Sequence, residues 1–172
     1  MGHWILAATA GVAILASGTA SSAQCLISGK YILDRGQSDD VTHAIESAHP
    51  GASDINWRDV RNRLFKSILS YDELRISSIA GRFSAQYDNP KPLIDVWISG
   101  EPIKWKLNDG QVFDVSAKAN DEAVLLTLRG VYSEQTIVYR SVGQQLVVET
   151  TIISPKFIFA PIHYKLVYDP AK

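Results

Sequence analysis

The chain has 172 residues, 46% hydrophobic and 20% charged, which is the composition of one ordinary globular domain. Its formal net charge is -1 and its pI is about 6.4, so no overall positive field favours binding to nucleic acid. The only cysteine, Cys25, excludes an internal disulfide and a thiolate metal cluster. The four histidines (His3, His43, His49 and His163) lack the spacing of metal ligands, and we expect no metal and no cofactor.

The first 23 residues have the pattern of a secretory signal peptide. An uncharged apolar run fills residues 5–16, which is short for a membrane span but typical of a signal-peptide core. Ser21, Ser22 and Ala23 supply small residues for cleavage. This predicts a single mature domain over residues 24–172 in a periplasmic or secreted protein. Because no Lys or Arg precedes the run, an uncleaved anchor or a buried N-terminal helix is the alternative.

Cys25 lies just after the predicted cleavage site, where a lipoprotein carries its lipidated cysteine. Gln24 and Ser22 do not fit a lipobox, which favours a free thiol near the mature terminus. Contact with a membrane is expected only if Cys25 is lipidated.

Two short helices are predicted after a first strand at residues 29–34. Ser38 is the expected N-cap of the first helix, with Asp39 and Asp40 in its first turn. A second helix should begin at Asn56, with Asp59 completing a capping box.

The second helix has an apolar stripe and a basic face. Arg58, Arg61, Arg63 and Lys66 form the basic face. It is a candidate docking surface for an anionic partner, a lipid headgroup or a ligand carboxylate. The alternative is a solvated helix face whose cations pair with nearby carboxylates.

The remaining sequence predicts a series of strands. The candidates are residues 74–77, 81–87, 93–98, 103–107, 112–117, 123–129, 135–140, 146–153 and 162–168. Gly81 is a candidate bulge, and Asn108-Asp109-Gly110 is a tight-turn signal. Short connections favour antiparallel neighbours, and closure removes the edges of a long meander. The fold class is therefore mainly β, a meander closing into a barrel of about ten strands, with two short helices after the first strand.

The order of one strand, two short helices and an unbroken meander resembles the fatty-acid-binding-protein branch of the calycins. Residues 136–140, 145–150 and 166–169 are similar to the last strands of that family. The resemblance implies a helical lid over a barrel that binds a lipid-like molecule. Residues 29–34 followed by 38–41, and residues 154–155 before 164–168, are similar to the start and the end of a group of small exported bacterial proteins. This second resemblance is compatible with export and says nothing about activity.

The chain departs from that family at the polar anchor for a ligand carboxylate. The family has an Arg-x-Tyr pair on its last strand, and the matching residues here are Leu166 and Tyr168. Arg129 or Arg140 would replace the missing arginine only if its side chain points inward.

Several large side chains on the predicted strands are candidates for lining a cavity. The aromatic candidates are Trp97, Trp105, Phe113, Tyr139, Tyr164 and Tyr168, with Arg129, Arg140 and His163 as polar contacts. The alternatives are ordinary core packing of the aromatics and an outward-facing His163.

Catalytic patterns are thin in this sequence. No nucleophile elbow and no phosphate-binding Gly-rich loop occurs. Asp95, Asp114 and Glu149 would form a carboxylate pair only if the fold brought two of them together. We therefore predict no catalytic residues, and an exported barrel that binds a small apolar or amphipathic, lipid-like molecule. The alternative is a non-catalytic envelope interaction module with a filled barrel that acts through its surface.

Overall fold

The computed structural model describes residues 27–48, 55–68, 71–88, 91–154, 158 and 160–172. The predicted signal peptide and Cys25 lie outside these residues. The first part of the described chain contains β1 (Ser28–Leu33), α1 (Val41–Ser47), α2 (Ile55–Ser67), β2 (Glu73–Ile79), β3 (Arg82–Tyr87) and β4 (Ile94–Trp97). The second part contains β5 (Ile103–Lys106), β6 (Val112–Ala119), β7 (Ala123–Arg129), β8 (Glu134–Val142), β9 (Gln145–Ile153) and β10 (Ile162–Pro170).

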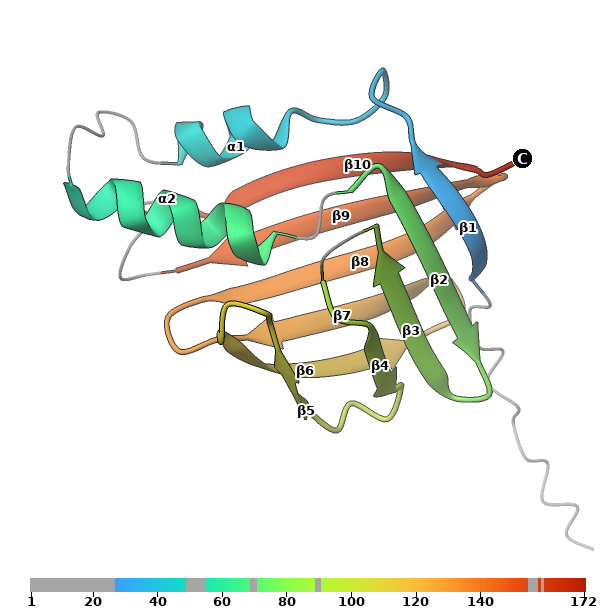
Figure 1. Ribbon diagram of the computed structural model, residues 1–172. Coiled ribbons are helices and arrows are strands. Elements are labelled where there is room, and N and C mark those ends of the chain that lie inside the picture. The colour runs from blue at the N-terminus through green and yellow to red at the C-terminus, as the bar shows by residue number, and fades with distance from the viewer. Residues whose placement is uncertain (1–26, 49–54, 69–70, 89–90, 155–157, 159) are drawn as a thin grey trace, which may run out of the picture.

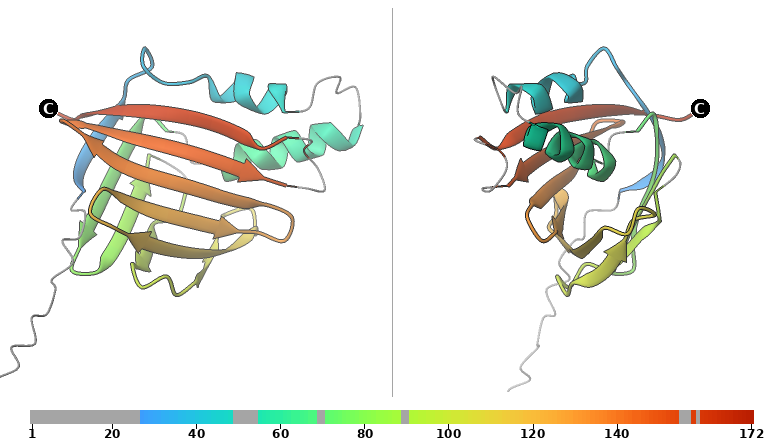
Figure 2. Two further views of the ribbon diagram at one scale, coloured as in Figure 1. Left: turned by 180° about the vertical axis from the view of Figure 1, so that it is seen from behind. Right: turned by 60° about the vertical axis from the view of Figure 1, so that its left-hand side comes forward.

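The strands form one antiparallel sheet that curls into a nearly closed barrel (Figures 1 and 2). Their order is β4-β3-β2-β1-β10-β9-β8-β7-β6-β5, so the first and last strands pair with each other. β4 and β5 are the two edges of the sheet, and an isolated bridge between Ser99 and Lys118 links the segment after β4 to β6. The predicted fold class, a ten-stranded antiparallel barrel with two helices after the first strand, is confirmed.

Alternation along the strands places apolar side chains inside the barrel. On β7, Val124, Leu126 and Leu128 are fully buried, whereas Leu125 and Thr127 between them are only half-buried. Successive side chains of a strand point to opposite faces, so this pattern sends every second residue into the core. Burial of that apolar surface is the main free energy that closes the sheet.

The helices α1 and α2 lie together over one side and one end of the barrel (Figure 1). Ile45 of α1 and Trp57 and Leu64 of α2 are buried against the strands. The described helices include none that is long and apolar enough to cross a membrane. The predicted start of α1 was wrong, because the N-cap is Asp40, whose carboxylate accepts a hydrogen bond from the His43 amide.

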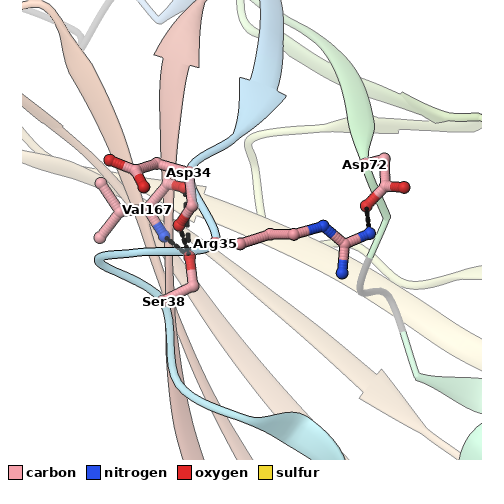
Figure 3. Close-up of polar contacts among 5 residues, drawn as sticks. All are labelled: Asp34, Arg35, Ser38, Asp72 and Val167. Carbon is pink, nitrogen blue, oxygen red and sulfur yellow. Dashed lines mark hydrogen bonds and ion pairs between the residues drawn. The ribbon is translucent and has the colours of Figure 1, made fainter.

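Ser38 and Asp39 attach the helical pair to β10 instead of capping α1. The Ser38 hydroxyl donates to the carbonyl of Asp34 (2.7 Å) and accepts from the amide of Val167 (2.9 Å) (Figure 3). One carboxylate oxygen of Asp39 accepts from the amide of Lys165 at 2.7 Å. These side chains satisfy backbone donors of β10 at the point where β1 leaves it, so they fix the direction of the chain that leads to α1.

The same loop is tied to the strand that follows the helices. The guanidinium of Arg35 lies 2.6 Å from the carboxylate of Asp72, just before β2 (Figure 3). Both side chains are exposed, so this ion pair orients the loop and adds little stability.

Two turns show how local sequence sets the strand register. Ala80 (φ 52°) and Gly81 (φ 78°) form a two-residue turn between β2 and β3, so the predicted bulge at Gly81 was wrong. The predicted Asp109-Gly110 turn is confirmed: Gly110 has a φ of 89°, and the Leu107 amide donates to the carbonyl of Gln111 at 2.8 Å.

Candidate functional site: a groove beneath helix α2

A groove of about 400 Å³ lies between α2 and the ends of the strands below it. Its walls come from α2, the start of β6, the loop at residues 130–133 and Ser154 after β9. Figure 1 shows α2 beside the β7–β8 connection at this end of the barrel. The apolar wall residues are Val60, Leu64, Val112, Phe113, Val131 and Tyr132.

The apolar walls reach from the surface to the core. Leu64 and Phe113 are buried members of the core, whereas Val112, Val131 and Tyr132 are 43%, 83% and 50% exposed. An apolar surface that continues from solvent into a core is characteristic of a site for a partner or ligand.

Charge is confined to the rim of the groove. Asp59 and Arg63 are its charged wall residues; they lie one turn apart on α2 and have opposite signs. The rim therefore has no strong net charge, and the interior of the groove offers an apolar environment.

Hydrogen bonds hold both ends of the groove in place. The hydroxyl of Ser67 donates to the carbonyl of Leu64 (3.0 Å) and accepts from the side-chain amide of Gln135 (3.0 Å). The hydroxyl of Ser154 donates to the carbonyl of Tyr132 at 2.7 Å, which ties the 130–133 loop to the end of β9. Gln135 is fully buried on β8, so the groove wall connects directly to the polar groups of the barrel interior.

The barrel interior contains a cluster of tyrosines. The hydroxyls of Tyr87 and Tyr139 lie 2.7 Å apart, and Tyr164 and Tyr168 are buried beside them. Burial raises the pKa of each of these four side chains well above its ordinary value. They are therefore neutral hydrogen-bonding groups at physiological pH.

Five of the six aromatic cavity candidates lie inside the barrel and one does not. Trp105, Phe113, Tyr139, Tyr164 and Tyr168 are buried, and Phe113 is the one among them that lines the groove. Trp97 is 50% exposed, with the guanidinium of Arg82 lying 4.8 Å from its ring centroid on the outer surface.

Arg129 and Arg140, the candidate polar contacts whose direction the sequence left open, lie on the outer face. Arg129 pairs with Glu134 and Arg140 with Glu149, each at 2.7 Å, and both arginines are exposed. Neither replaces the family's interior arginine. His163 also faces outward, where Nδ1 lies 3.0 Å from the hydroxyl of Thr151.

The predicted basic face of α2 is exposed only in part. Arg58, Arg63 and Lys66 are exposed, whereas Arg61 is half-buried, pairs with Glu46 of α1 and lies over the ring of Phe65. Arg61 thus joins the two helices. The docking role of this face stays a prediction.

The three strand carboxylates do not form a catalytic pair. Asp95, Asp114 and Glu149 form ion pairs with Arg82, Lys104 and Arg140 on neighbouring strands. Within the described residues no group of three or more His, Cys, Asp or Glu side chains is placed to hold a metal ion.

Sequence reasoning missed the interior polar residues Gln135, Thr150 and Tyr87. Gln135 and Thr150 lie two residues before Ile137 and Ile152 on their strands, so each points to the same inner face as the isoleucine that follows it. This alternation was the signal available in the sequence.

No family model and no curated protein matches this sequence. Solved structures do match. The chain superposes on a "secretary abundant heat soluble (SAHS) protein" from Ramazzottius varieornatus with a TM-score of 0.59 and 10% identity, covering 84% of this chain and 94% of the other. For the "REP1-NXSQ fatty acid transporter" the TM-score is 0.56 and the identity 12%, with 84% and 96% covered. Fatty-acid-binding protein 1 of Echinococcus granulosus gives 0.53 and 11%, with 85% and 98% covered. The chain therefore has a calycin-like β-barrel fold.

Proposed function

We propose that this protein binds a small apolar or amphipathic, lipid-like molecule in the groove beneath α2. The observation that carries the proposal is an apolar groove of about 400 Å³ at the helix-covered end of the barrel, a volume typical of small-molecule sites. The names of two structural neighbours, a fatty acid transporter and a fatty-acid-binding protein, support the same ligand class.

The ligand's apolar segment would lie against Phe113 and Leu64, which are already part of the core. Val131 and Tyr132 would lose part of their exposed surface when the groove is filled. Each square ångström of apolar surface removed from water contributes roughly 25 cal/mol, so a chain that covers these residues has a substantial driving force for binding.

The test is native mass spectrometry of protein purified from its own source, followed by organic extraction. A stoichiometric lipid should co-purify with the unmodified chain and be absent from Ser133→Trp, because an indole at this groove-lining position fills the site. Ser141→Trp, at an exposed position on β8, is the matched control and should retain the ligand. A bare mass, with no thermal shift across a lipid panel, would contradict the proposal.

A second candidate function is docking of a protein partner on the rim of the groove. The observation that favours it is Val131, which is 83% exposed beside the half-exposed Tyr132. This alternative would be favoured if the purified protein carries no lipid but binds a protein partner, and if Val131→Ser abolishes that binding.

We also infer export, from the apolar run at residues 5–16 and the small residues that follow it. N-terminal sequencing of the protein from its own cell should give a chain beginning near Gln24. A chain that keeps residues 1–23 would contradict cleavage.

A further inference from the structure

We propose that the polar head of the ligand is uncharged and donates a hydrogen bond to the side-chain oxygen of Gln135. This inference rests on the proposed function and names the chemical class of the head group: a hydroxyl or an amide in place of a carboxylate.

Gln135 has an open acceptor just behind the groove wall. Its amide nitrogen donates to the Ser67 hydroxyl at 3.0 Å, and Ser67 lines the groove. The single hydroxyl proton of Ser67 goes to the carbonyl of Leu64, so the Ser67 oxygen can only accept from Gln135. This fixes the orientation of the amide and leaves its oxygen, Oε1, buried and without a hydrogen-bond partner.

Two further buried hydroxyls, which face each other, lie beside Gln135 on the inner face of the barrel. Thr150 faces Ile137 on β8, one diagonal step from Gln135, and it faces Tyr164 on β10. The hydroxyls of Thr150 and Tyr164 are both buried and interact with each other, without a hydrogen bond of good geometry to any other group. Buried polar atoms of this kind are costly unless something pairs with them, and a ligand's head group would do so.

The buried polar side chains of the described residues are all uncharged: Ser67, Ser78, Gln135, Thr150 and Ser154. An ionised carboxylate has acceptors only, so it would face the Gln135 oxygen acceptor to acceptor. It would also leave water without a buried cation to pair with, which is strongly unfavourable. A hydroxyl or amide has a proton to donate and carries no such cost.

The charged groups near this end of the barrel do not change the preference for an uncharged head group. Arg63 lies on the exposed rim of the groove with Asp59 on the same helix. The ammonium of Lys91 donates to the carbonyl of Ile68 at 2.5 Å, at the C-terminal end of α2.

The experiment measures displacement of Nile red from the purified protein by dodecanol, dodecanamide and dodecanoate at about pH 8, where the acid is ionised. Dodecanol and dodecanamide should bind at least about tenfold more tightly than dodecanoate, because the carboxylate lacks the donor and keeps its charge. All three share one alkyl chain, so the head group is the variable.

Gln135→Met removes the acceptor while keeping a side chain of similar length. It should weaken dodecanol binding by about fivefold to tenfold and leave Nile red binding unchanged. Gln145→Met, at the half-buried start of β9 where the side-chain amide bonds to Asp169 outside the barrel interior, is the matched control and should change neither.

Thr150→Val and Tyr164→Phe keep the experiment decisive if Gln135→Met does not fold. Each should weaken dodecanol binding severalfold, because each removes a buried hydroxyl beside the Gln135 oxygen. A purely structural role for these hydroxyls would lower the free energy of unfolding and leave the affinity for dodecanol unchanged, so the affinity is the deciding measurement.

Four results would overturn the inference. The first is equal affinity for dodecanoate and dodecanol, which leaves the proposed function standing. The second is dodecanol binding that no interior variant changes. The third is a preference for dodecanoate that disappears in Arg63→Ala, because the head group would then bind at the rim of the groove and not at Gln135. The fourth is a protein that binds neither Nile red nor any dodecyl compound, which removes the proposed function as well.

Discussion

The hydroxyls of Tyr87 on β3 and Tyr139 on β8 meet 2.7 Å apart inside the barrel. Four strands of the sheet, β2, β1, β10 and β9, separate β3 from β8, so this hydrogen bond joins opposite walls. The ring of Phe83 packs against Tyr139 with centroids 5.1 Å apart. The barrel is thus held across its interior as well as around its wall.

Replacing Tyr139 by Phe should lower the free energy of unfolding by about 1 to 2 kcal/mol, because the Tyr87 hydroxyl is left buried without its partner. Tyr87→Phe should have a similar effect, and the double variant should lose less than the sum of the two. A double-mutant cycle by chemical denaturation measures the coupling. Strictly additive losses would mean that this hydrogen bond does not couple the two walls.

The buried tyrosines predict a loss of stability in alkali. Burial raises the pKa of Tyr71 to about 12 and raises those of Tyr87, Tyr139, Tyr164 and Tyr168 as well. The unfolded chain releases these protons near pH 10 and the folded chain holds them, so their contribution is complete below pH 10 and declines above it. Tyr87, Tyr139, Tyr164 and Tyr168 should each cost about 1 kcal/mol per pH unit in that window, and the half-buried Tyr71 should cost less.

The measurement is urea unfolding between about pH 10.5 and pH 11.5, with tyrosinate absorbance followed in parallel. This window lies above the range in which Lys91 acts in the opposite sense, since burial lowers its pKa to about 8 from 10.5. Tyrosinate absorbance should rise for the buried tyrosines only as the protein unfolds. A smooth titration of all seven tyrosines in a still folded protein would contradict the prediction.

Ser38→Ala should destabilise the protein by about 1 to 2 kcal/mol, because the Val167 amide loses its acceptor. The exposed Ser141→Ala on β8 is the matched control and should change stability by less than about 0.5 kcal/mol. Thermal or chemical denaturation of the two variants measures the difference. Equal stabilities would show that the hydrogen bond between Ser38 and Val167 contributes nothing to stability.

Arg129→Ala and Arg140→Ala should leave lipid binding unchanged, since both side chains are exposed and paired with carboxylates on the outer face. Each should change the free energy of unfolding by less than about 1 kcal/mol. Nile red binding and denaturation check both statements. Loss of binding in either variant would place an arginine at the site and contradict the outward orientation.

Much of this fold could be predicted from the sequence, because the alternation of a strand and the residues that favour a turn depend only on neighbouring positions in the chain. The β7 strand was predicted with its observed bounds, and the tight turn at Asp109-Gly110 was predicted at its observed place, since each depends on a few adjacent residues. Local patterns also misled. Ser38 has the chemistry of an N-cap, but it bonds to β10, and Asp40 caps the helix.

The candidate site was less predictable. The sequence alone determined which strands form and which apolar residues alternate, because the two-residue period of a strand is written in neighbouring positions. The alternation along β7 also accounts for the outward direction of Arg129, because this residue comes directly after Leu128, the last of the buried residues Val124, Leu126 and Leu128. Only the tertiary structure decided that Ser67 meets Gln135 and that Tyr87 meets Tyr139, at sequence separations of 68 and 52 residues. Such contacts depend on closure of the whole sheet and on the packing of α2 over its end, and no local pattern encodes either of them.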